Sequence, residues 1–204
     1  MIITEIQEVT KAKVKVFIDY EFAFVLYKGE LRTYGICKEK ELDEDIYRTI
    51  IDEVLTKRAK LRSMHLLKSR DYTRYGLSDK LRKDFYPDEV IEEAISYVMS
   101  YGYVDDERYA RSYISYAGKT KSRKQIECYL MQKGVSKQDI ADAFGELEES
   151  DALGSEESLI QALLVKKHYK RESANIEERR KIIGFLYRKG FSLDKIYKVV
   201  GESD

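Results

Sequence analysis

The sequence has one proline, eleven glycines and no tryptophan in 204 residues. Proline and glycine interrupt regular secondary structure, so their scarcity favours long helices joined by short turns. No run of about 18 apolar residues occurs, which argues against a membrane-spanning helix. The opening MIITEIQEVTKAK carries acidic residues ahead of any apolar stretch, which argues against a secretory leader. We therefore expect a mainly α-helical, cytoplasmic protein that has no contact with a membrane.

Cysteine and histidine are equally sparse, with two of each. Cys37 and Cys128 form no CxxC pair, so neither a disulfide framework nor a clustered metal site is indicated. We expect two free, partly buried thiols, no metal and no cofactor. The sequence also has no glycine-rich phosphate loop, HExxH motif or nucleophile elbow, which argues against an enzyme.

The 37 basic and 37 acidic residues give a net charge of zero, which removes any global electrostatic argument for nucleic-acid binding. Basic residues are concentrated between 57 and 83, where only Asp71 and Asp79 oppose ten lysines and arginines. Acidic residues are concentrated between Glu146 and Glu157. The basic block is suited to phosphates or to an acidic protein face, and it is equally typical of a solvated helix face.

The first 38 residues differ in pattern from the rest of the chain. Apolar and basic residues alternate over 13–18, and an apolar run follows at 22–27. Alternation with a period of two predicts a small hairpin region of two or three antiparallel strands, with a turn near Asp19-Tyr20-Glu21. Three lysines then share one face of a strand: Lys11, Lys13 and Lys15.

From about Glu41 apolar residues recur at spacings of three and four, which predicts an amphipathic helix running to Lys68 with Leu61 and Met64 on its apolar face. Residues that commonly begin helices precede four later helical runs: Pro87, Asp105, Ser136 and Ser192. Further helices are expected at 77–84, 88–100, 106–116, 123–133, 137–147, 156–167, 176–189 and 193–200.

Three of these segments, 75–95, 124–144 and 180–200, align without a gap. Each has an apolar pair four residues apart and then, four residues on, a position occupied by Gly134 and Gly190 in two segments and by Phe85 in the first. Glycine can adopt the left-handed conformation that ends a helix, and serine or proline then begins the next one. An amphipathic stretch precedes each segment, so the repeating unit has three helices.

A three-helix unit buries little apolar surface alone, so we expect three such repeats to stack into an elongated, curved array. The expected segments are a strand region at 1–38 and repeats at 39–100, 101–150 and 151–204. Such an array offers an extended surface for binding another macromolecule at several points. We expect it to be a monomer.

The stretch GYVDDERYA at 102–110 resembles the Gly-Tyr-Leu-Asp-Asp-x-x-Phe-Ala motif of the RecX family, and SRKQI at 122–126 is similar to the segment that follows it. The first repeat matches only in part, because Tyr75 and Ser78 replace the Ser and Glu of the family pattern. The resemblance covers most of the chain, including a strand region of the type seen in Gram-positive members. Its structural markers are Gly102, Tyr103, Asp105, Asp106, Tyr109, Ala110, Leu130, Gly134 and Gly190.

The resemblance implies a protein that binds along the groove of RecA filaments on single-stranded DNA and inhibits filament growth, strand exchange and the SOS response. The basic block between 57 and 83 could in addition make weak, non-specific contact with the single-stranded DNA inside a filament. Candidate contacts are the arginines seven residues before each aligned leucine, namely Arg74, Arg123 and Arg179, although each could instead cap a helix or pack over a turn. Further candidates, by charge and position at loop ends, are Arg70, Lys119, Lys121 and Lys124.

Other conspicuous residues have structural explanations. Asp105 and Asp106 are expected to cap a helix, and Tyr103 and Tyr109 to lie in the core. An alternative function is a helix-turn-helix DNA-binding protein that does not contact RecA, because such modules also place a tight turn before their third helix. Its recognition helix would be 137–147, whose acidic residues would repel phosphates: Asp139, Asp142 and Glu146.

Overall fold

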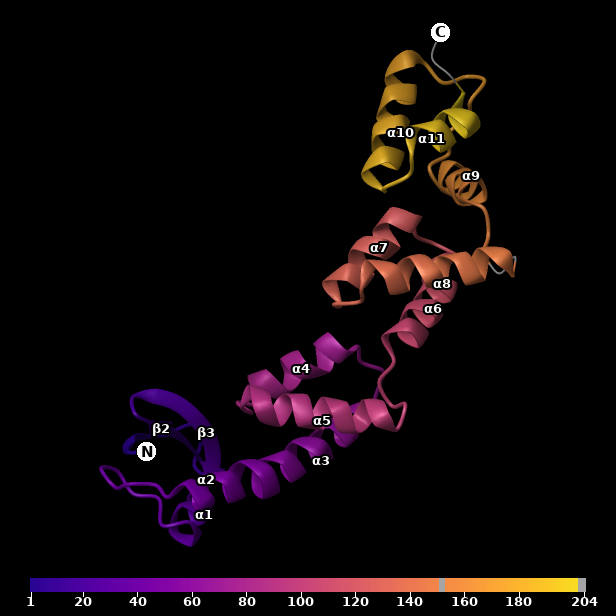
Figure 1. Ribbon diagram of the computed structural model, residues 1–204. Helices are drawn as coiled ribbons and strands as arrows, with labels where there is room; N and C mark the ends of the chain where they lie inside the picture. The colour runs from indigo at the N-terminus through magenta and orange to yellow at the C-terminus, as the bar shows by residue number, and fades with distance from the viewer. Residues whose placement is uncertain (151–152, 202–204) are drawn as a thin grey trace. The chain divides into compact units, whose positions relative to one another are not determined.

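The computed structural model describes residues 1–150 and 153–201, and the chain divides into two compact units, Met1–Asp105 and Asp106–Asp204 (Figure 1). Both units are mainly helical, and a small antiparallel sheet precedes three successive three-helix domains, as the sequence predicted. The first unit has one hydrophobic core, to which the sheet and the first domain both contribute. The second unit has two cores, one in each of its domains.

The N-terminal sheet has three strands, β1 (Ile3–Glu8), β2 (Lys13–Ile18) and β3 (Glu21–Tyr27), in the order β1-β2-β3. Asp19 and Tyr20 form the predicted turn with φ values of 49° and 71°, which matches the right-handed twist of a tight hairpin. Apolar residues of β2 point into the core, whereas the lysines of its other face lie over aromatic rings: Lys13 over Tyr27, and Lys15 over Phe22 and Phe85.

After the sheet comes a short helix that the sequence did not indicate, α1 (Lys28–Thr33). The amphipathic helix predicted from Glu41 is formed by α2 (Glu44–Arg48), a π-helical segment (Thr49–Leu55) and α3 (Thr56–Leu67). The Thr56 hydroxyl donates to the carbonyl oxygen of Ile51, 2.9 Å away, within this widened turn. Beyond it the buried residues of α3 are Thr56, Ala59 and Ser63. Leu61 is therefore 65% exposed, and its predicted place on the apolar face is wrong.

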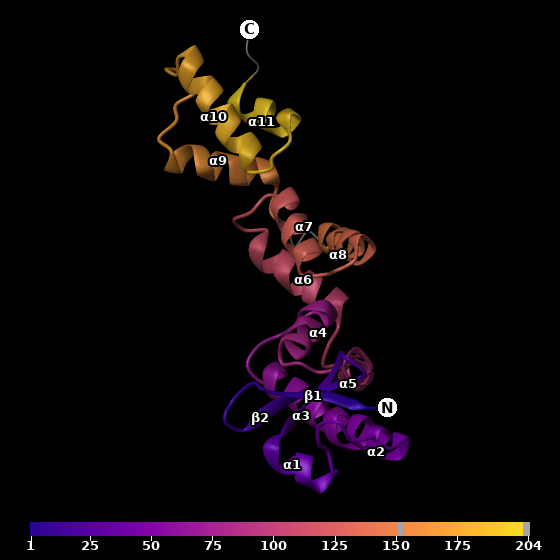
Figure 2. The same ribbon diagram turned by 90° about the vertical axis from the view of Figure 1, so that its left-hand side faces the viewer.

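The eight remaining helices follow the predicted ranges closely. In each domain the first helix packs against the third, as Figures 1 and 2 show for α9 and α11. Leu81, Leu130 and Leu186, the aligned leucines, are each fully buried in the core of their own domain, which confirms the repeat. The helices are α4 (Arg74–Lys83), α5 (Asp88–Ser100), α6 (Asp106–Ala117), α7 (Arg123–Gln132), α8 (Lys137–Glu149), α9 (Glu156–Lys166), α10 (Ile176–Arg188) and α11 (Leu193–Val200).

The same turn joins the second and third helices of all three domains. In the second domain, the N–H of Val135 donates to Leu130 O and that of Gly134 to Met131 O, at 3.1 and 2.9 Å. Gly134 and Gly190 have φ values of 82° and 86°, as predicted for residues that end a helix. Ser136 then caps α8 by accepting from the N–H of Asp139, whereas the side chain of Ser192 makes no capping hydrogen bond.

Phe85 occupies the glycine position of the first domain and still adopts the left-handed conformation, with φ 66°. Its ring lies 4.1 Å from Lys15 Nζ and 6.4 Å from the Phe22 ring, between centroids. Contacts with the sheet thus offset the backbone strain of a non-glycine residue there, which costs about 1–2 kcal/mol.

We expect Phe85→Ala to be less stable than Phe85→Gly by about 1 kcal/mol. Both substitutions remove the ring, but only alanine retains a Cβ in the left-handed conformation. Urea unfolding of the two variants beside the unsubstituted protein measures the difference. Equal stability of the two variants would show that this backbone conformation is not strained.

Two expectations about burial are wrong. Cys37 and Cys128 are free but exposed, because Cys37 lies in the loop after α1 and Cys128 faces away from the buried Ile126 and Leu130. Tyr103 is 48% exposed and stacks beside Tyr101, with 6.1 Å between the ring centroids, because it follows the turn that ends α5. Tyr109 is half-buried against the second core. The expected capping by Asp105 and Asp106 stays a prediction.

Candidate functional site

Two of the three candidate arginines, Arg74 and Arg123, begin the middle helix of their domain, and Arg179 is the fourth residue of the middle helix of the third domain. Arg74 is exposed and forms an ion pair with Glu92 on α5, with 2.9 Å between Nη2 and Oε2. Arg123 is half-buried, pairs with Glu127 and Glu148 at 3.0 and 2.6 Å, and lies over the Phe144 ring. Arg179 is half-buried on α10. These contacts favour a structural role for Arg123.

The second and third domains meet at the beginning of α7. Ser122 is fully buried, and its hydroxyl donates to the carbonyl oxygen of Lys189, 2.6 Å away. The backbone N–H of Arg123 donates to Glu156 Oε1 at 2.8 Å, and Lys195 Nζ donates to the other carboxylate oxygen of Glu156 at 2.8 Å. This hydrogen bond raises the pKa of Lys195 above its ordinary value. We call this contact, made by Ser122, Arg123, Glu156, Lys189, Gly190 and Lys195, the α7 junction.

The predicted basic block between 57 and 83 is largely neutralised within the first unit. Six of its ten cations form ion pairs there: Arg58–Glu30, Lys60–Glu93, Arg62–Asp84, Arg74–Glu92, Arg82–Asp88 and Lys83–Asp79. Such partly exposed pairs contribute little to stability, but they reduce the positive potential that a phosphate would meet. Arg70 is exposed beside Tyr72, with its guanidinium carbon 4.6 Å from the centre of the ring.

Unlike the basic block, a groove between α7 and the C-terminal end of α10 gathers positive charge in one place. It has a volume of about 430 Å³, and we call it the α7–α10 groove. Three cations line it, Lys121, Lys124 and Arg188, beside two tyrosines, Tyr129 and Tyr187. The remaining lining residues are uncharged: Gln125, Cys128, Gln132 and Gly190. The structure therefore brings together two sequence-predicted cations, and it adds Arg188, which no sequence pattern singled out.

Lys121 is held at one side of this groove by a stacked pair of tyrosines. The rings of Tyr113 and Tyr129 lie 4.2 Å apart between centroids and only 16° from parallel. Lys121 Nζ donates to the Tyr113 hydroxyl at 2.6 Å, and this hydrogen bond raises the pKa of the lysine above its ordinary value. Lys121 is therefore a cation in a defined position. Lys119 is exposed in the preceding loop, and Lys124 is exposed on α7.

The alternative recognition helix, α8, presents acidic groups instead. Asp142 is exposed, and Glu146 is paired with Arg111 on α6, with 2.9 Å between Nη1 and Oε2. A negative helix face is unfavourable for approach to phosphates. Across residues 1–150 and 153–201, no group of His, Cys, Asp or Glu is placed to hold a metal ion. Within the same ranges, no helix has the length and apolar character to cross a membrane.

Comparison with known protein families gives three matches, which follow one another along the chain. The model described as RecX, first three-helix domain, matches residues 59–97. The second three-helix domain matches 105–143, and the third matches 155–200. Together these matches cover more than half of the chain.

Individual proteins agree with the family models. The chain is 31% identical to the regulatory protein RecX of Caldanaerobacter subterraneus subsp. tengcongensis over 98% of each chain. It is 28% identical to the regulatory protein RecX of Clostridium acetobutylicum, over 97% of this chain and 93% of the relative. A crystal structure of regulatory protein RecX superimposes with a TM-score of 0.64 at 25% identity, over 98% of both chains. The crystal structure of RecX from Lactobacillus salivarius, at 23% identity, has a TM-score of 0.59 over 72% of this chain and 94% of that one.

Proposed function

Because the chain belongs to the RecX family, whose named members are regulatory proteins, we propose that it modulates the RecA recombinase, mainly by inhibition. In this proposal it binds RecA filaments assembled on single-stranded DNA in the cytoplasm. It thereby regulates recombinational DNA repair and the SOS response. It acts as a monomer, without catalysis and without a cofactor.

The observation that carries this proposal is the match of all three domains, in order, to the three domains of RecX. We propose that the predicted segments, 1–38, 39–100, 101–150 and 151–204, together contact several RecA protomers. Several weak contacts along one filament give a high overall affinity without a deep pocket.

The α7–α10 groove supports a particular location for part of that contact. Its three cations lie beside exposed aromatic surface, a combination that suits an acidic protein face or the backbone and bases of single-stranded DNA. Lys121, Lys124 and Arg188 are our proposed contacts there, with Lys119 in the preceding loop as a further contact and weak DNA binding as a second role. Arg70, Arg74 and Arg179 are proposed contacts elsewhere, whereas we assign Arg123 to the α7 junction.

The proposal predicts suppression of RecA-dependent ATP hydrolysis. We expect the protein, added at amounts below one molecule per RecA protomer, to reduce ATPase activity stimulated by single-stranded DNA and to reduce strand exchange. The assay is repeated over a range of salt concentrations, because a contribution from phosphate contacts weakens steeply as salt rises. Unchanged ATPase activity, with tight sequence-specific binding to duplex DNA, would instead favour the helix-turn-helix alternative.

A further inference from the structure

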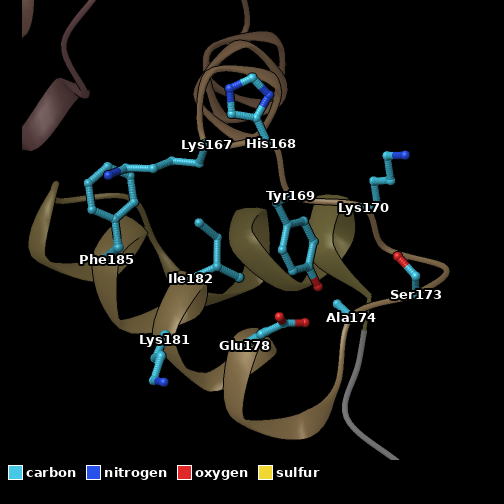
Figure 3. Close-up of a pocket in the computed structure, with 10 residues that line it drawn as sticks. All are labelled: Lys167, His168, Tyr169, Lys170, Ser173, Ala174, Glu178, Lys181, Ile182 and Phe185. Atoms are coloured by element: carbon cyan, nitrogen blue, oxygen red, sulfur yellow. The ribbon is translucent and has the colours of Figure 1, made fainter.

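The third domain contains a second pocket, of about 450 Å³, between the end of α9, the connecting segment and α10 (Figure 3). Tyr169, Ile182 and Phe185 provide its apolar lining. Three lysines also line it, Lys167, Lys170 and Lys181, against a single carboxylate, that of Glu178. The pocket thus combines an apolar patch with a net positive charge.

The hydroxyl group of Tyr169 is buried and has no hydrogen-bond partner among the described residues. The tyrosine is positioned by the turn that ends α9, in which its N–H donates to Leu164 O at 3.0 Å and His168 adopts φ 54°. Figure 3 shows the ring beside Ile182 with its hydroxyl directed towards the end of the pocket where Glu178 and Ala174 lie. Because an unsatisfied buried hydroxyl costs about 1–3 kcal/mol, this group is well placed to donate to a ligand.

The lysines are available for an anion. Lys181 is 3.9 Å from Glu177 in a pair whose side chains are both about 80% exposed, so the pair is loose. Lys167 Nζ lies 5.0 Å from the centre of the Phe185 ring and, like Lys170, forms no ion pair within the described part of the chain. The carboxylate of Glu178 accepts the N–H of Asn175 at 3.1 Å in a capping box, and its one negative charge is outnumbered by the three lysines of the lining.

We propose that this pocket binds a segment of a partner protein in which acidic side chains flank an apolar one. The carboxylates would accept hydrogen bonds from the Tyr169 hydroxyl and from the lysines, while the apolar side chain packs on Ile182 and Phe185. Phosphate is a poorer fit because no arginine lines the pocket and the beginning of α10 is capped by its own side chains. This inference goes beyond the proposed function, because it involves a different surface and does not depend on RecA.

The test uses a short fluorescein-labelled peptide that alternates glutamate with leucine, measured by fluorescence anisotropy on the full chain. We expect the double variant Lys167→Gln, Lys181→Gln to raise the Kd about five-fold, as expected for two exposed ion pairs. Tyr169→Phe, which removes only the hydroxyl, is expected to raise it about three-fold. Lys166→Gln is the matched control, because Lys166 is an exposed lysine of α9 that does not line the pocket.

Two further measurements test the proposal, one with a neutral peptide and one with competing phosphate groups. Binding of a peptide with glutamine in place of glutamate as tightly as the acidic peptide would overturn the proposal, and so would pocket variants that behave like Lys166→Gln. Displacement of the peptide by inorganic phosphate or by a single-stranded oligonucleotide at constant ionic strength would also overturn it, because the site would then recognise phosphate. Circular dichroism of each variant ensures that a weaker interaction reflects the pocket and not the fold.

Discussion

Gly190→Ala is expected to destabilise the second unit by about 3 kcal/mol and to loosen the α7 junction. Gly190 has φ 86°, where a Cβ costs about 1–2 kcal/mol. That Cβ would also lie 2.8 Å from Ser122 Oγ and 3.2 Å from Lys124 Cβ. Ser122 is fully buried and hydrogen-bonded to Lys189, so relief of the clash breaks a buried hydrogen bond, which adds about 1–2 kcal/mol.

Gly102→Ala is the matched control for this substitution. Gly102 has φ 67°, but a Cβ at this position would meet nothing within 4 Å. Only the backbone strain of about 1–2 kcal/mol is then expected. Urea unfolding of both variants gives the two losses, and amide hydrogen exchange around residues 122–124 reports opening of the junction. Equal losses, with unchanged exchange in the Gly190 variant, would contradict the close contact between the two domains.

The repeat could be predicted from the sequence because each aligned position meets a requirement of its own helix or turn. Each aligned leucine stands four residues after another apolar residue, so that both lie on the buried face of one helix: Leu81, Leu130 and Leu186. This spacing does not depend on what packs around the domain. The glycines at 134 and 190 satisfy a backbone requirement that is equally local. The boundaries of α5 to α11 follow from such rules and were predicted to within two residues, whereas α4 begins three residues before its predicted start.

Contacts between elements distant in sequence could not be predicted in this way. Phe85 stands where the other two domains have glycine, and only its contact with the sheet explains why the turn still forms. Leu61 fits a regular helical period but falls outside the buried face once a π-helical turn precedes it. No pattern within α1 to α3 marks that widened turn in advance.

The candidate site shows the same difference between local patterns, which could be predicted, and contacts between distant elements, which could not. Charge and loop position identified Lys121 and Lys124, which do line a positive groove. The repeat alignment selected Arg123, whose carboxylate partners come from its own helix and from α8. Arg188 was not predicted because its place in the groove depends on the end of α10 lying beside α7, and the sequence of neither helix indicates that.

Reversing the charge of the α7–α10 groove is expected to have the largest effect on function. The triple variant Lys121→Glu, Lys124→Glu, Arg188→Glu changes three lining cations into anions. We expect at least about ten-fold more of this variant to be needed for half-inhibition of RecA ATPase activity, since loss of about 0.5 kcal/mol per contact already gives that factor. The salt dependence of inhibition should also become shallower, because fewer counterions are released on binding.

A second triple variant, Lys137→Glu, Lys166→Glu, Arg180→Glu, serves as the control, because it changes the net charge equally at exposed positions outside the groove. Its inhibition is expected to match that of the unsubstituted protein. Arg123→Ala should differ from both, losing about 1–2 kcal/mol of stability through its two ion pairs and its contact with the Phe144 ring. If both triple variants inhibit equally, while the unsubstituted protein still suppresses RecA, the groove is not the contact surface and the function must be carried by other faces of the domains.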